Sequence, residues 1–111
     1  MTDNPWKKIY DAIGEAAALE MVAEEAAELS AAASKAARIV RGENPARMTL
    51  DAAYAALREE FADVDNARDV LDAGAEGAGA VYSIATRDTL QYKKMTRWYK
   101  SLFGEEAEQC G

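Results

Sequence analysis

Two long alanine-rich segments of this chain carry apolar residues at alternating spacings of three and four. This spacing gathers the residues on one side of an α-helix, which has about 3.6 residues per turn. No strand-like alternation of apolar and polar residues stands out along the chain. The pattern therefore predicts two helices that pack closely along these residues. They are Leu19, Val22, Ala26, Leu29, Ala33, Ala36 and Val40 in the first segment, and Leu50, Tyr54, Leu57, Phe61, Val64, Ala67 and Leu71 in the second.

Helix-starting and helix-ending residues mark the first half of the chain. Asn4 followed by Pro5 is typical of an N-cap and the first residue of a helix. Gly14 is expected to bend or break this helix. The long helix that follows is expected to end near Arg41, because Gly42 comes next and glycine favours the left-handed conformation at a helix end.

The second half of the chain has similar signals. Thr49 is a plausible N-cap for a helix from Leu50 to about Asp72. The stretch Ala73–Ala80 contains three glycines and is expected to be a flexible connection. A last helix is expected from about Ser83 to Phe103, followed by a frayed polar tail over Gly104–Gly111. We therefore expect an all-α fold, an antiparallel bundle of about four helices.

Composition excludes several kinds of function. The chain has no histidine and a single cysteine, Cys110, which excludes Ser-His-Asp catalysis, zinc sites that use histidine and an internal disulfide. The net charge of −7 argues against binding a nucleic-acid polymer, whose phosphates attract a basic surface. No apolar run is long enough to cross a membrane, and no signal peptide stands out. We expect one soluble, cytoplasmic domain over residues 1–111 with no membrane partner.

Four carboxylates form two pairs next to the apolar stripes, Glu25 with Glu28 and Glu60 with Asp63. A spacing of three puts both members of a pair on one helix face. Glu28 lies 14 residues before the helix-ending glycine, and Glu60 lies 11 residues after the N-cap threonine. At about 1.5 Å per residue they stand about 21 and 17 Å from the loop of an antiparallel hairpin. Four like charges at one level need a cation, and their oxygens suit Mg²⁺, with Mn²⁺ as a substitute.

The carboxylate motifs resemble those of the MazG-like nucleoside triphosphate pyrophosphohydrolases over roughly residues 19–71. The segment from Glu24 to Glu28 is similar to the first metal-binding helix of that family, and the segment from Glu59 to Asp63 to the second. The resemblance implies Mg²⁺-dependent hydrolysis of a nucleoside triphosphate, including a noncanonical or deoxy one, to a monophosphate and pyrophosphate. It also implies a helical bundle completed by oligomerisation, as a homodimer or homotetramer.

The same resemblance suggests roles for single residues. Glu24, beside the first metal ligand, would orient or deprotonate the attacking water. Basic and amide side chains near the motifs would bind the nucleotide and its phosphates. Each of these residues is also compatible with an ordinary helix surface. The candidate substrate-binding residues are Lys35, Arg38 and Asn66, which continue the carboxylate faces of the two helices, and Lys94 and Arg97 on the last helix.

Two questions stay open at the level of sequence. The first is which aromatic residue contacts the base, because Trp6, Tyr10, Tyr54, Trp98 and Tyr99 all fit a core or subunit interface equally well. The second is the function itself. A related all-α phosphohydrolase, dUTPase-like or phosphoribosyl-ATP hydrolase-like, would share the four carboxylates. A noncatalytic helical interaction module would carry them as surface charges.

Overall fold

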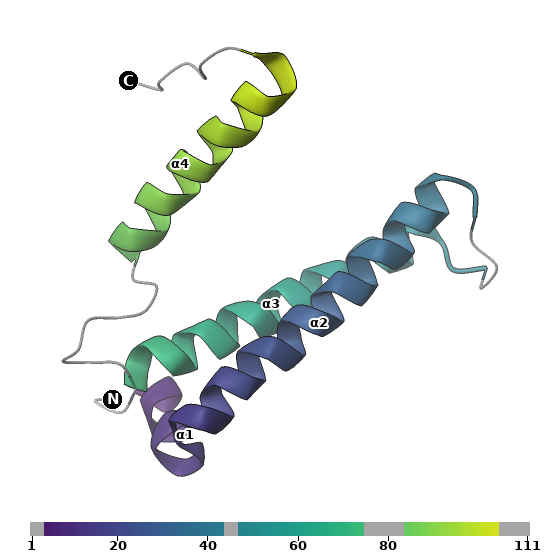
Figure 1. The fold of residues 1–111 in the computed structure, drawn as a ribbon. Helices are drawn as coiled ribbons and strands as arrows, with labels where there is room; N and C mark the ends of the chain where they lie inside the picture. Colours follow the sequence, from purple (N-terminus) through teal and green to yellow (C-terminus); the bar gives the residue numbers. More distant parts are fainter. Residues whose placement is uncertain (1–3, 44–46, 75–83, 105–111) are drawn as a thin grey trace.

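A computed structural model describes residues 4–43, 47–74 and 84–104 of the chain (Figure 1). The described residues form helices and no strand, which confirms the all-α prediction. Most of the expected glycine-rich connection and the tail beyond Gly104 lie outside the described residues. In chain order the helices are α1 (Pro5–Ile13), α2 (Glu15–Val40), α3 (Leu50–Gly74) and α4 (Ile84–Phe103).

The start of α1 and its separation from α2 follow from local sequence. The side chain of Asn4 accepts hydrogen bonds from the backbone N–H groups of Trp6 and Lys7, at 3.0 and 3.2 Å, and Pro5 is the first helical residue. Both features match the predicted N-cap. Gly14 has a φ of 87°, so the chain turns there and α1 ends before α2 begins.

The end of α2 is a Schellman motif. Gly42 has a φ of 78°, and its N–H group donates a hydrogen bond of 3.0 Å to the carbonyl of Ile39. The N–H group of Glu43 donates one of 2.8 Å to the carbonyl of Arg38. These two bonds satisfy carbonyl groups that the helix itself leaves free. The predicted end of this helix is therefore confirmed.

The start of α3 agrees with the sequence, whereas its end lies two residues further on than expected. The Oγ1 atom of Thr49 accepts a hydrogen bond of 3.1 Å from the N–H group of Ala52, as expected for an N-cap. At the other end α3 continues to Gly74. A Cβ atom at Gly74 would overlap the ring of Tyr10, so the missing side chain lets α1 approach the end of α3.

Helices α2 and α3 form a long antiparallel hairpin, and the short helix α1 packs at its open end, mainly against α3 (Figure 1). Helix α4 stands apart in Figure 1, and the described part of the chain shows no contact between it and the other three helices. None of the described helices is both long and apolar enough to cross a lipid bilayer.

The predicted stripes are buried in part: Ala36, Ala67 and Leu71 are buried as expected, and the other buried residues, Ala18, Ala53 and Val70, each lie next to a predicted position. Ala18 and Ala53 are buried, whereas Leu19, Tyr54 and Phe61, which the periodicity placed in the interface, are 50%, 46% and 53% exposed. Alanine lets two helices approach closely, so the larger side chains lie at the edge of the contact. One carboxylate of each pair is half-buried at this interface, Glu25 on α2 and Glu60 on α3, whereas Glu28 and Asp63 are exposed.

Candidate metal centre

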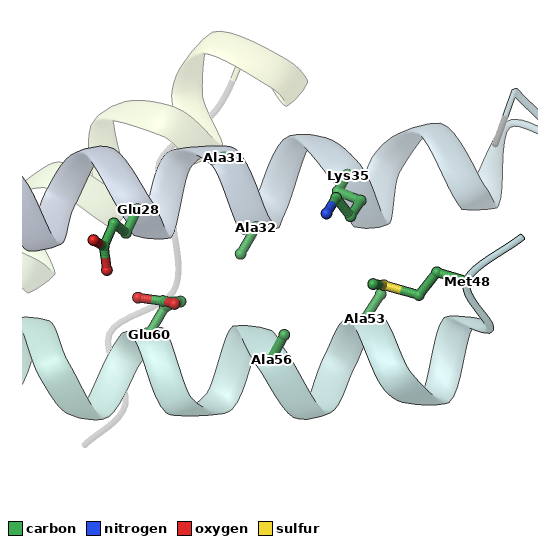
Figure 2. Close-up of a pocket in the computed structure, with 8 residues that line it drawn as sticks. All are labelled: Glu28, Ala31, Ala32, Lys35, Met48, Ala53, Ala56 and Glu60. Atoms are coloured by element: carbon green, nitrogen blue, oxygen red, sulfur yellow. The ribbon is translucent and has the colours of Figure 1, made fainter. Parts of the chain in front are cut away.

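The hairpin brings together the four carboxylates that the sequence pairs. Glu25 and Glu28 come from α2, and Glu60 and Asp63 come from α3. One ligand oxygen from each residue can be chosen so that all four lie within 4.8 Å of one another. Figure 2 shows Glu28 and Glu60 side by side in the space between the two facing helices. The level predicted by counting from the loop is therefore the level observed.

Two of these carboxylates are short of hydrogen-bond partners. Glu25 and Glu60 are half-buried, and the Oε2 atom of each is shielded from solvent without a hydrogen-bond partner. Within the described ranges, none of the four carboxylates forms an ion pair with a basic side chain. A shielded carboxylate oxygen without a partner is costly, so the cluster as it stands lacks a positive charge.

The same crowding raises two pKa values. The pKa of Glu25 lies above its usual value because the carboxylate loses contact with water, and the charges of Glu28, Asp63 and Glu60 add to this effect. Loss of water contact is also the main cause of the raised pKa of Glu60, followed by the charges of Glu28 and Asp63. Both shifts reflect an environment that disfavours negative charge.

The donor set fits a hard divalent cation. All four candidate ligands are carboxylates, the ligands that Mg²⁺, Mn²⁺ and Ca²⁺ prefer to histidine or cysteine. A cation bound there would offset the repulsion and give the two shielded oxygens a partner. Two of the four residues, Glu28 and Asp63, are exposed, so the centre also opens to solvent and to a ligand.

A pocket of about 290 Å³ lies on the hairpin-loop side of the carboxylates (Figure 2). Glu28 and Glu60 line one end of it, and Lys35 and Met48 lie further toward the loop. The rest of its wall is alanine. Lys35 is thus the predicted substrate-binding cation that shares a pocket with the carboxylates. Met48 was not anticipated, because a methionine ahead of a helix carries no signal of a binding site.

A second pocket, of about 360 Å³, lies on the side of the carboxylates that faces α1. Glu25 and Asp63 line it together with Asn66 and the aromatic ring of Trp6. The indole Nε1–H of Trp6 donates a hydrogen bond of 3.2 Å to Oδ1 of Asn66, which leaves the amide N–H₂ group of Asn66 for another partner. Of the five aromatic candidates, Trp6 lines this pocket beside the cluster.

The other predicted site residues lie further away. Glu24 is exposed on α2 and lines neither of these two pockets, although its charge contributes to the raised pKa of Glu25. Arg38 is exposed in the last turn of α2. Lys94 and Arg97 belong to α4, which does not contact the hairpin among the described residues. Their roles in substrate binding stay predictions.

No protein-family model, curated protein or solved structure matches the chain. The resemblance to the MazG-like pyrophosphohydrolases therefore rests on the carboxylate motifs of the sequence alone.

Proposed function

We propose that the chain is a Mg²⁺-dependent nucleoside triphosphate pyrophosphohydrolase of the MazG-like type. The observation that carries this proposal is the meeting of four carboxylates from α2 and α3 within 4.8 Å, with two shielded oxygens that lack a partner. A structural role would favour a neutral or paired cluster, because four like charges oppose packing of the hairpin. A site that binds a metal and a nucleotide explains why they are kept together.

The two pockets support a direction for the substrate along the hairpin. The pocket beside Trp6 and Asn66 combines an aromatic ring, apolar side chains and an amide donor, which suits a nucleobase. The opposite pocket contains the cation of Lys35, which suits the polyphosphate. The anhydride between the α- and β-phosphates would then lie at the carboxylates, between the two pockets.

In this proposal different side chains bind the metal ion and activate the attacking water. Glu25, Glu28, Glu60 and Asp63 hold the metal, and Glu24 orients the attacking water or accepts its proton. Mg²⁺ bound at the centre would neutralise phosphate charge and lower the pKa of a water molecule. The oxygen of the water forms a bond to one phosphorus of the α–β anhydride, and the bridging P–O bond breaks. The products are a nucleoside monophosphate and pyrophosphate.

The contacts to the departing pyrophosphate are assigned first to Lys35, because it already shares a pocket with the carboxylates. Arg38 lies one turn beyond Lys35 and is the next candidate. Lys94 and Arg97 could act only if an α4 helix reached the cluster. The proposal includes a homodimer or homotetramer in the cytoplasm, and no membrane or nucleic-acid polymer as a partner. Large apolar side chains left exposed on all four helices support the assembly.

A pyrophosphate-release assay tests the proposal. The chain is incubated with each ribo- and deoxyribonucleoside triphosphate in the presence of Mg²⁺, Mn²⁺ or EDTA. We expect release that requires the divalent ion and is lost in the Glu28→Gln variant. The matched control is Glu20→Gln, because Glu20 is an exposed glutamate of the same helix outside the cluster.

Other results would favour the alternatives. Turnover confined to dUTP or to phosphoribosyl-ATP would indicate one of the related all-α phosphohydrolases. A protein that binds Mg²⁺ without hydrolysing any nucleotide would refute the catalytic proposal. If neither metal binding nor turnover were found, a noncatalytic helical interaction module would be the better description.

A further inference from the structure

One broad side of the hairpin carries large apolar residues that nothing in the described chain covers. We call it the apolar face, defined by Leu19 and Val40 of α2 and by Leu50, Tyr54 and Phe61 of α3. On α2, Leu19 and Val40 are 21 residues apart, and Ala26 and Ala33 lie between them at spacings of seven residues. Because seven residues are close to two helical turns, these residues form one stripe. On α3 the spacings are four and seven, which again gives one stripe.

The apolar face lies opposite the two pockets beside the carboxylates. At about 100° per residue, Lys35 is roughly 160° around α2 from Leu19, and Asn66 is roughly 140° around α3 from Phe61. Lys35 and Asn66 line the pockets, and α1 packs on that same side, because Trp6 shares a pocket with Asn66. The apolar face is therefore separate from the candidate metal centre, and α1 does not cover it.

Helix α4 has a complementary surface. Tyr92, Met95, Tyr99 and Leu102 follow one another at spacings of three, four and three, so they share one side of the helix. Leu102 is 77% exposed, and Trp98, at the edge of this side, is 68% exposed. In the described residues α4 contacts no other helix, although a single helix with so much exposed apolar surface is expected to be covered.

Charge decides between two possible partners for the apolar face. Helix α2 contains five acidic and two basic residues, α3 contains seven acidic and two basic residues, and α4 contains five basic residues and one acidic residue. Packing the apolar faces of two hairpins together would bring strongly acidic helices side by side. Packing α4 there would bring opposite charges together, which is the arrangement that complementary interfaces use.

We propose that the apolar face of the hairpin binds helix α4 of a second copy of this chain, in a reciprocal dimer. The chain's own α4 stands away from its hairpin in Figure 1, which leaves both surfaces for a second copy. In a two-fold dimer each hairpin receives one α4, so all four apolar surfaces are covered at once.

The dimensions of the helices agree with this arrangement. At about 1.5 Å per residue, the 20 residues of α4 extend over about 30 Å and the 25 residues of α3 over about 37 Å. Helix α4 contains four aromatic residues, Tyr92, Trp98, Tyr99 and Phe103. Each of them can bury up to about 150–250 Å². Two such helices reach the roughly 1,200–2,000 Å² that stable dimers bury.

Disulfide trapping between two single-cysteine variants tests the proposal. Both variants carry Cys110→Ser, one with Phe61→Cys and an affinity tag, the other with Met95→Cys and no tag. Each new cysteine lies near the middle of its helix, so the two sites can meet in either direction of packing. The control variant replaces Phe61→Cys by Ala52→Cys, nine residues earlier and roughly half a turn around α3. Circular dichroism verifies that each variant keeps its helices.

We expect a tagged–untagged disulfide from Phe61→Cys with Met95→Cys and none from the Ala52→Cys control. We also expect light scattering to give the cysteine-free protein twice the 12.0 kDa of the chain. Disulfides between two Phe61→Cys chains alone would show hairpin-to-hairpin packing and overturn the proposal. It would also be overturned by a monomeric mass, or by a chain carrying both cysteines that closes an intramolecular disulfide. None of these readouts depends on catalysis, so the outcome is independent of the proposed function.

Discussion

Replacing Glu28 by glutamine is expected to change thermal stability in opposite directions with and without a divalent cation. The four carboxylates lie within 4.8 Å of one another, so four charges make six repelling pairs, and three of these pairs include Glu28. Glutamine keeps the shape of the side chain and removes those three pairs. In EDTA at neutral pH the variant should therefore melt at a higher temperature than the wild-type chain.

With Mg²⁺ the order should reverse. Binding at a concentration a hundredfold above Kd stabilises a folded protein by about 2.7 kcal/mol. For a domain of this size that corresponds to a rise in Tm on the order of 10 °C, at about 4–8 °C per kcal/mol. The variant lacks one of the four ligands and should lose most of this rise. The wild-type chain should then be the more stable of the two.

The assay is thermal unfolding followed by circular dichroism, in EDTA and across a Mg²⁺ titration. Glu20→Gln removes one acidic charge from the same helix outside the cluster, so it should behave like the wild-type chain in both conditions. A lower Tm for Glu28→Gln in EDTA would show that the four carboxylates do not destabilise the fold by repulsion. An equal rise with Mg²⁺ in both proteins would place the bound cation elsewhere.

Three further outcomes are expected. Because the pKa values of Glu25 and Glu60 are raised from 4.5, the folded apo chain holds protons that the unfolded chain has released. The contribution of these two residues to the free energy of unfolding therefore falls as the pH rises through their folded-state pKa values. In thermal unfolding with EDTA, the Tm of the Glu25→Gln/Glu60→Gln variant should rise relative to that of the wild-type chain between pH 4.5 and neutral pH. Gly74→Ala should destabilise the fold by about 1–3 kcal/mol in urea unfolding, because the new methyl group overlaps a ring of α1. Lys35→Ala should lower kcat/KM roughly 10- to 150-fold through loss of a charge-assisted hydrogen bond, and the same loss in Arg97→Ala instead would show that α4 supplies the phosphate contact.

The ends of the helices and the level of the carboxylates could be read from the sequence because each depends on short-range chemistry. Asn4 and Thr49 carry side-chain oxygens that accept hydrogen bonds from the next turn, and Gly42 adopts the left-handed conformation that a Schellman motif requires. Helical rise is constant, so counting from the loop was enough to bring Glu28 level with Glu60.

The periodicity predicted the burial of Ala36, Ala67 and Leu71, but the choice between neighbouring residues near the start of each long helix was decided only in the tertiary structure. Both Leu19 and its neighbour Ala18 belong to patterns of three and four residues, and hydrophobicity alone favours the leucine. Alanine is buried instead, because small side chains let α2 and α3 approach closely enough to pack along their length. The larger residues are left at the edge of the contact, where they form the apolar face. The same close approach places Glu25 and Glu60 at the interface, where water is partly excluded and their pKa values rise.

Contacts between residues far apart in the sequence likewise could not be predicted from the sequence alone. The hydrogen bond between Trp6 and Asn66 joins residues 60 positions apart, and both residues line the pocket beside the carboxylates. No local pattern encodes such a pair, because it depends on how α1 folds back across α3, and that approach requires the bare backbone of Gly74. Local hydrogen bonds and helical spacing thus determined where the helices begin and which charges meet. The faces that became buried depended on how closely the helices could approach.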